Sequence, residues 1–92
     1  MPVCELCQFD EVFNFHHLIP RTVHRNKWFR KRYTRAECQQ GLQICLECHR
    51  TIHQFIPSEK ELGRHYNTRE KLVAHQGIAR YLKWKRRRVD RE

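Results

Sequence analysis

The sequence has little of what stabilises most small domains. Hydrophobic residues make up only 39% of its 92 residues, while charged residues make up 32%. Repeats, low-complexity tracts and Gly/Ser linkers are absent, which predicts a single domain. A core this small gives modest stability, so we expect an additional staple: a disulfide, a metal or a partner subunit.

Targeting segments are also absent from the sequence. No signal peptide precedes Cys4, and no apolar run approaches the roughly 20 residues that cross a bilayer. These absences argue against a secreted or membrane-spanning protein, and we expect a reducing, cytoplasmic setting. Paired C-x-x-C units in such a setting bind zinc more often than they form disulfides.

Acidic residues are scarce relative to basic ones. Nineteen Lys and Arg face ten Asp and Glu, which gives a formal net charge of +9 and a pI near 9.8. Such an excess favours a polyanionic partner, and nucleic acid before membrane because no amphipathic anchor dominates. The alternative is a basic protein whose charges are simply solvated.

Cysteines supply the expected staple. Four of the five form two pairs, "CELC" and "CLEC", at positions Cys4, Cys7, Cys45 and Cys48. Four thiolates match the closed tetrahedral shell of structural zinc, which would tie the N-terminus to the second pair. The alternative is four packed free thiols. The fifth, Cys38, is expected to remain a free thiol.

Periodicity predicts a small α+β domain. The alternation in "EVFNFHH" (11–17) indicates a short strand, and "GLQI" (41–44) indicates a second. Residues 20–36 contain no acidic residue and read as a long loop with a helical turn around 28–33. Helical character resumes at "CHRTIHQF" (48–55).

The C-terminal third is predicted to be helical. "SEKE" is a capping box, with Ser58 as the cap of a helix running to about Tyr66, and Asn67 is expected to cap the next. A last helix after Gly77 places apolar residues on one face, with Lys85 on the same line. We therefore expect a core over 1–56 and a helical extension of the same domain over 57–92.

Histidines form a second candidate ligand set. His49 and His53 are four residues apart, so on a helix they share one face, and His16 could supply a third ligand. His17 would then point to the opposite side of the strand and remain free as a general base. Alternatively, these histidines are packed or solvated, or His49 replaces a cysteine in the zinc shell. The remaining histidines lack such context and are expected at the surface, at most as phosphate contacts: His24, His65 and His75.

The order "C-x-x-C … HHLIP … C-x-x-C-H-x-x-x-H" resembles the HNH endonucleases, the zinc-knuckle branch of the ββα-metal fold. The resemblance covers about residues 4–53, and the later helices resemble those of small bacterial HNH proteins. It implies a ββα-metal core stapled by a four-cysteine zinc site, with C-terminal helices, in bacterial or phage cytoplasm. The implied activity is metal-dependent hydrolysis of DNA phosphodiesters.

The resemblance also implies residue roles. His17 would be the general base, while His16, His49 and His53 would hold one catalytic divalent cation: Mg, Mn, Ni or Zn. His53 is the ligand that many relatives lack. The motif Asn, which orients the base or braces the loop, is replaced by Gln40, whose amide is one methylene further out. This departure supports an alternative, a non-catalytic zinc-binding nucleic-acid module on the same fold.

Basic residues mark where DNA would lie. Aromatics interleave with them at 28–33, and these either stack on bases or fill the core. We expect largely electrostatic contacts to the DNA backbone, with weak sequence preference. The predicted contacts are Arg21, Arg25, Lys27, Arg30, Lys31, Arg32 and Arg35, together with Lys85 and Arg86 of the basic tail. A third possible function is a zinc-stabilised protein-interaction domain, but such a domain does not account for the net charge of +9.

Overall fold

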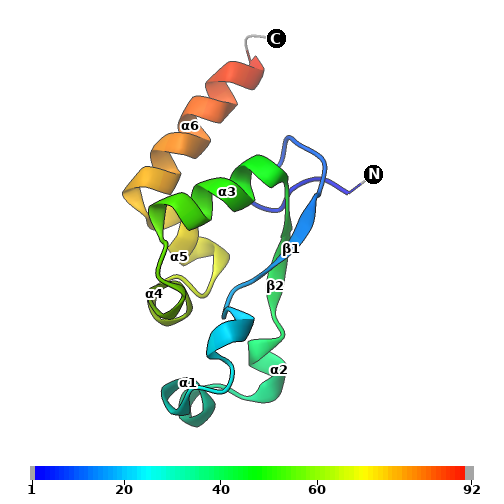
Figure 1. Cartoon of the computed structure of the whole chain (residues 1–92). Coiled ribbons are helices and arrows are strands. Elements are labelled where there is room, and N and C mark those ends of the chain that lie inside the picture. The colour runs from blue at the N-terminus through cyan, green and yellow to red at the C-terminus, as the bar shows by residue number, and fades with distance from the viewer. Residues whose placement is uncertain (1, 91–92) are drawn as a thin grey trace.

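A two-stranded antiparallel sheet and the helix that follows it organise the N-terminal half. The computed structural model describes residues 2–90. Strand β1 (Asn14–His17) pairs with β2 (Gly41–Ile44), so that His16 lies opposite Leu42 and His17 opposite Gly41. Helix α3 (Leu46–Phe55) begins directly after β2 and packs against β1 (Figure 1). The chain is thus a small α+β protein.

The predicted strand over 11–17 is shortened at its start. Glu11 and Val12 pair with the N-terminal turn instead, through the Val3–Glu11 bridge and the Val12 amide, which donates to the Pro2 carbonyl. The strand over 41–44 is confirmed. Helix α3 begins at Leu46, earlier than predicted, because the Cys45 side chain caps it by accepting from the Cys48 amide.

The helical turn predicted around 28–33 is confirmed, but further short helical segments interrupt the loop that was predicted for the rest of 20–36. This segment forms the 3-10 turn η1 (Arg21–Val23), α1 (Lys27–Arg32) and the first half of α2 (Arg35–Cys38). Asn26 caps α1, and Thr34 with Glu37 forms a complete capping box for α2. The signature T-x-x-E was present in the sequence, and the density of basic residues masked it.

The C-terminal third forms α4 (Glu59–His65), α5 (Arg69–Ala74) and α6 (Gln76–Asp90). Ser58 caps α4 as predicted, since its hydroxyl accepts from the Glu61 amide. The expected Asn67 cap is wrong: Thr68 caps α5, and the Asn67 amide donates to the Tyr33 hydroxyl at 2.8 Å. Helix α6 begins before Gly77 because the ring of His75 caps it.

One apolar cluster joins the sheet, α3 and all three C-terminal helices. Ile44, Ile52, Leu62, Leu72 and Ile78 are fully buried in it, beside the four paired cysteines. A smaller cluster, made of Ile19, Val23, Phe29 and Cys38, lies under η1, α1 and α2. The C-terminal helices therefore belong to the same packed unit as the sheet.

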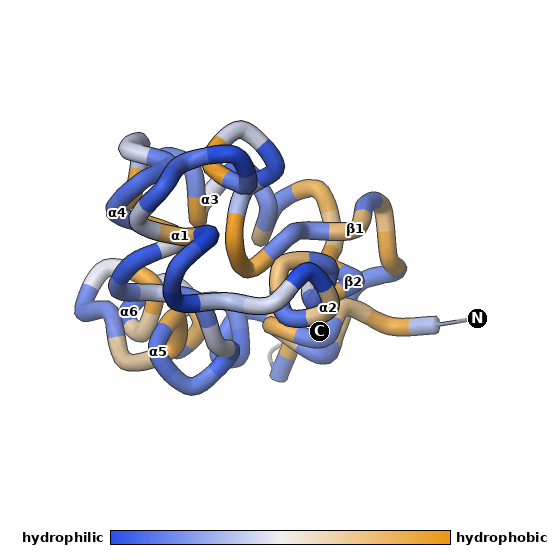
Figure 2. The backbone as a smooth tube through the Cα atoms, turned by 90° about the horizontal axis from the view of Figure 1, so that it is seen from below, coloured by the Kyte–Doolittle hydropathy of each residue, from blue (hydrophilic) through white to orange (hydrophobic). Residues whose placement is uncertain are grey.

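Apolar and hydrophilic residues alternate along the backbone. Figure 2 shows short apolar segments interrupted by hydrophilic ones in every part of the chain. Across residues 2–90, no helix is long and apolar enough to cross a membrane.

Candidate metal centres and basic cleft

The four paired cysteines form one buried cluster. Cys4 and Cys7 come from the N-terminal turn, and Cys45 and Cys48 from the start of α3; their Sγ atoms all lie within 4.8 Å of one another. The Cys7 and Cys45 sulfurs are 3.9 Å apart. A tetrahedral ion with Zn–S bonds of about 2.3 Å requires sulfurs about 3.8 Å apart, so the cluster could hold a structural metal such as zinc.

Backbone amides at the cluster favour charged sulfurs. The Leu6 and Cys7 amides donate to Cys4 Sγ at 3.3 and 3.4 Å, and the Cys48 amide donates to Cys45 Sγ at 3.4 Å. The hydrogen bond with Cys48 lowers the pKa of Cys4 to about 4, against the opposing effect of burial. The same hydrogen bond and burial raise the pKa of Cys48. Without a cation, the cluster therefore carries less than its full negative charge.

Cys38 lies apart from this cluster. Its free thiol is buried in the smaller apolar cluster with Ile19 and Phe29, as expected for a packed residue. Burial, with Glu37 nearby, raises the pKa of Cys38 and keeps the thiol protonated.

Three histidines form a second cluster. His16 comes from β1, while His49 and His53 lie one turn apart on α3, and one ring nitrogen of each lies within 4.8 Å of the others. The two Nε2 atoms of His49 and His53 are 3.1 Å apart. Among residues 2–90, His16 Nε2 is the one buried side-chain nitrogen or oxygen without a hydrogen-bond partner. An orphaned buried nitrogen facing two imidazoles fits a cation ligand.

Burial keeps the imidazoles of His16 and His49 neutral. His16 is only 3% exposed, and burial, with the neighbouring histidines, lowers its pKa to about 4. Burial and His53 also lower the pKa of His49. Neutral imidazole is the form that binds metal, so protons compete weakly at neutral pH.

The strand separates His17 from its neighbour. The His17 ring lies 5.0 Å from Phe15 and 5.9 Å from His24, between ring centroids, and is not part of the three-histidine cluster. It is half-buried. Burial, with His24 and Arg21, lowers the pKa of His17, so the ring is neutral and able to accept a proton near pH 7.

Gln40 lies at the entrance to β2. Its side chain is exposed, and its backbone carbonyl accepts from the amide of Leu18 at 3.1 Å. Residue 40 is thus joined through its backbone to the strand end that carries the histidine pair.

Several of the predicted DNA contacts line one cleft of about 960 Å³. Its cationic residues are Arg21, Arg25, Arg30 and Arg35, all exposed, with His24 beside them. The ring of His24 connects this cleft to His17, and its Nε2 lies 2.6 Å from the Ile19 carbonyl. The remaining predicted residues of this segment lie exposed on α1: Lys27, Lys31 and Arg32.

The aromatics of α1 are structural. Phe29 is fully buried, which confirms the core alternative for that residue. Trp28 is half-buried and is stacked by two guanidinium groups, with Arg32 4.1 Å and Arg64 4.4 Å from its ring centroid. Arg64 belongs to α4, so its contact with Trp28 links α1 to the C-terminal helices.

Lys85 corrects one prediction. Its side chain is 0% exposed and its ammonium lies 2.5 Å from Asp10 and 3.0 Å from Glu47, so it is not available to a DNA phosphate. Burial alone lowers its pKa, but the hydrogen bonds to these carboxylates outweigh burial and raise it. Arg86, the next residue, is exposed.

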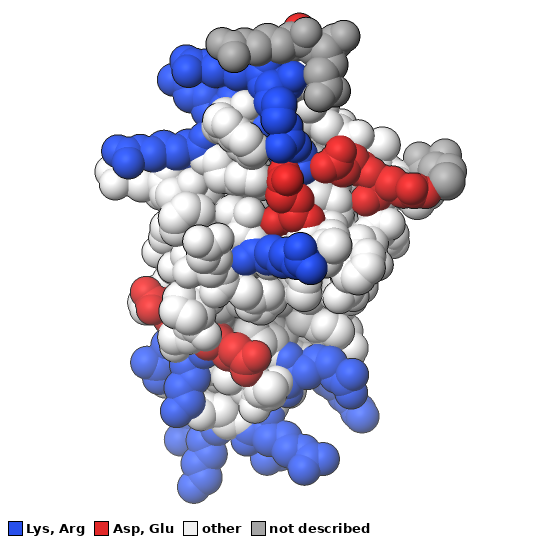
Figure 3. Space-filling model, turned by 45° about the horizontal axis from the view of Figure 1, so that its top comes forward, with Lys and Arg blue, Asp and Glu red and all other residues white. Residues whose placement is uncertain are grey.

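On the face drawn in Figure 3, most Lys and Arg side chains lie toward the two ends, and most Asp and Glu side chains lie between the ends. The longest dimension of the molecule is 47 Å.

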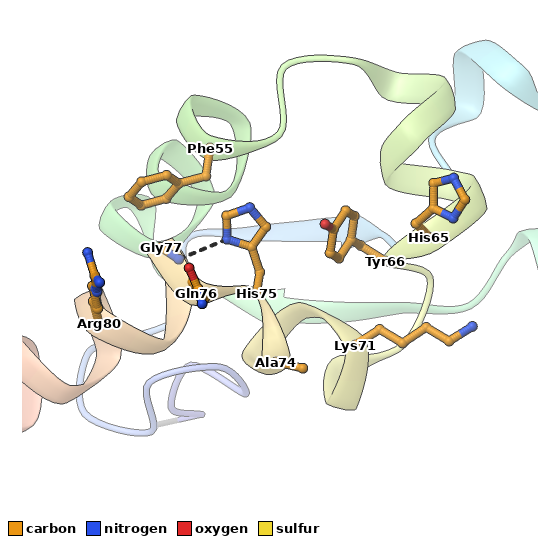
Figure 4. Close-up of a pocket in the computed structure, with 9 residues that line it drawn as sticks. All are labelled: Phe55, His65, Tyr66, Lys71, Ala74, His75, Gln76, Gly77 and Arg80. Carbon is orange, nitrogen blue, oxygen red and sulfur yellow. Dashed lines mark hydrogen bonds between the residues drawn. The ribbon is translucent and has the colours of Figure 1, made fainter.

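His75 belongs to a second cavity, of about 700 Å³, where α5 meets α6 (Figure 4). Its Nδ1 accepts from the Gly77 amide at 3.0 Å, and its ring lies 5.6 Å from Phe55 and 5.4 Å from Tyr66. It is a half-buried helix cap rather than a surface residue. His65, in contrast, is exposed as predicted.

Comparisons with models of protein families, with curated proteins and with solved structures find no match to this chain.

Proposed function

We propose that this protein is a metal-dependent endonuclease that hydrolyses DNA phosphodiester bonds, with His17 as general base. The observation that carries the proposal is the separation of the two adjacent histidines. His16 turns inward to two further imidazoles, whereas the His17 ring lies outside that cluster, 5.9 Å from the ring of His24, which lines the arginine cleft. The order of motifs in the sequence, which resembles the HNH endonucleases, supports the same reading.

The two clusters divide the work. The four cysteines saturate a tetrahedral ion and leave it no open position, so they serve the fold. The three histidines leave positions open for substrate. A divalent cation bound there supplies Lewis-acid stabilisation to the scissile phosphate and its leaving oxygen. Imidazole ligands favour Zn, Ni or Co over the harder Mg, although Mg and Mn remain candidates.

His17 carries the proton transfer. Its neutral ring accepts a proton from water as the water oxygen forms a bond to phosphorus, and the bond from phosphorus to the 3′ oxygen breaks. The depressed pKa of His17 keeps it in the accepting form at neutral pH. The arginines of the cleft hold the DNA backbone beside it and neutralise phosphates.

A second function, a non-catalytic zinc-binding nucleic-acid module, is favoured by one observation. Gln40 stands where the resemblance implies Asn, and its side chain is exposed. Its backbone carbonyl nevertheless bonds to Leu18, next to His17, so this strand end is braced without an Asn amide.

Nicking of supercoiled plasmid separates the two functions. Protein loaded with one zinc per chain receives Mg, Mn, Ni or further Zn, and His17→Ala is compared with the wild type in cleavage and in DNA binding. A general base contributes roughly 10²–10⁴-fold, so His17→Ala should lose cleavage by that factor and keep binding. His65→Ala, at an exposed histidine outside both clusters, is the matched control. DNA binding without cleavage under any metal would favour the binding module.

A further inference from the structure

We infer that Lys85 and Tyr81 of helix α6 form the outer coordination sphere of the four-cysteine metal site, and that the Lys85 ammonium sets how tightly the metal is held. The inference concerns the cysteine site alone and holds whether or not the protein cleaves DNA. It assigns a role to the C-terminal helix that neither knuckle motif predicts.

Two polar groups of α6 contact two of the four sulfurs. Lys85 Nζ lies 3.6 Å from Cys45 Sγ, within hydrogen-bonding distance for sulfur. The Tyr81 hydroxyl lies 3.2 Å from Cys48 Sγ, and Lys85 Nζ donates to that hydroxyl at 3.3 Å. Both contacted cysteines belong to the second knuckle, on α3. The sulfur of Cys4 in the first knuckle accepts hydrogen bonds from backbone amides instead.

Charge explains why an ammonium is buried here. A divalent ion with four thiolates carries two net negative charges, and the carboxylates of Asp10 and Glu47 lie beside the site. Lys85 is the fully buried cation among these groups, and its three protons can serve Asp10, the Cys45 sulfur and the Tyr81 hydroxyl, while Glu47 lies 3.0 Å away as an ion-pair partner. Removing it leaves an uncompensated negative cluster in the core.

Tyr81 orders the same network. Its hydroxyl donates to Glu47 at 3.1 Å or to Cys48, and it accepts from Lys85. When Cys48 is a metal-bound thiolate, that single proton is shared between the thiolate and the carboxylate. Outer-sphere partners of this kind orient ligands and tune the metal, and their loss typically costs 10–100-fold in metal affinity.

Cobalt substitution tests the inference, because Co²⁺ bound to thiolates has a sulfur-to-metal charge-transfer band. Lys85→Met should weaken Co²⁺ binding by roughly 10–100-fold. It should also move the band to lower energy, because a thiolate without its hydrogen-bond donor holds its electrons less tightly. Tyr81→Phe should move the band in the same direction. Lys83→Met, at an exposed lysine of the same helix, should change neither quantity.

The band position separates an outer-sphere role from a merely structural one, since loss of packing alone would not shift it. If Lys85→Met binds Co²⁺ with wild-type affinity and an unshifted band, the inference is wrong. If Lys85→Met does not fold, Tyr81→Phe tests the inference through the same two quantities, the affinity for Co²⁺ and the energy of the charge-transfer band. A wild-type protein without any thiolate band would overturn both the metal site and this inference, independently of the result of the plasmid assay.

Discussion

Removing the metal from the four-cysteine cluster should unfold the protein. The perturbation is Cys48→Ser, or EDTA added to the wild type. Apart from the burial of Leu6 in the apolar cluster and the ion pair of Asp10 with Lys85, a small set of hydrogen bonds holds the N-terminal turn. Between the turn and β2, the Glu5 amide donates to the Gln43 carbonyl, the Phe13 amide donates to the Ile44 carbonyl, and the Gln43 amide donates to the Glu5 side chain. From α5, Arg69 reaches the Glu5 and Leu6 carbonyls.

The expected magnitude exceeds the stability of the domain. Structural zinc contributes about 10–16 kcal/mol in small zinc-dependent peptides. A domain of 92 residues is stable by about 5–14 kcal/mol, at roughly 0.05–0.15 kcal/mol per residue. Loss of the ion therefore removes an amount comparable to or larger than the whole stability, and four buried thiols remain in its place.

The assay is urea denaturation followed by far-UV circular dichroism and tryptophan fluorescence, with zinc-loaded and EDTA-treated protein. We expect a cooperative transition with zinc and none with EDTA or in Cys48→Ser. Cys38→Ser is the matched control, because Cys38 is buried but lies outside the cluster. A metal-free protein with native circular dichroism and the same urea midpoint would refute the reasoning.

Two further predictions concern the histidines and the cleft. The pKa of His16 is lowered from 6.5 to about 4, so the unfolded chain binds more protons between these values; stability from this group is present above pH 6.5 and declines as pH falls toward 4. The zinc-loaded protein, with no second cation added, should lose roughly 1 kcal/mol of its free energy of unfolding from this group by pH 5.5, and His16→Asn should not show this loss. If the urea midpoint changes by the same amount between pH 7.5 and pH 5.5 in the wild type and in His16→Asn, the prediction is contradicted. In the cleft, Arg25→Ala and Arg30→Ala should each reduce the slope of log K for DNA binding against log salt by about 0.9. A slope unchanged in fluorescence-anisotropy titrations would place the DNA elsewhere.

Local sequence patterns predicted those parts of the structure that depend on neighbouring residues. The alternation of side chains along a strand predicted that His16 and His17 point to opposite sides, and the four-residue spacing on a helix predicted that His49 lies next to His53. The C-x-x-C spacing placed each pair of sulfurs within reach of one ion. In each case the geometry is fixed within a few residues by the strand or helix itself.

Features that depend on tertiary contacts were not predictable in this way. Lys85 lies on the same helix face as Ile78, but only packing against Asp10, 75 residues earlier in the chain, explains why a lysine is buried there. The basic composition of 20–36 concealed its short helices, although Asn26 and Thr34 are recognisable caps. The role of His75 as a cap depends on where α6 begins.

The most direct test of the central claim is the cleavage rate of zinc-loaded protein as a second cation is added, in wild type and in His49→Ala. The account predicts that protein with one zinc per chain is folded but inactive. Added Mn or Ni should then restore cleavage in the wild type, while His49→Ala remains folded and loses that response. Full cleavage by protein with one zinc per chain, or an unchanged metal response in His49→Ala, would contradict the assignment of structure to the cysteines and chemistry to the histidines.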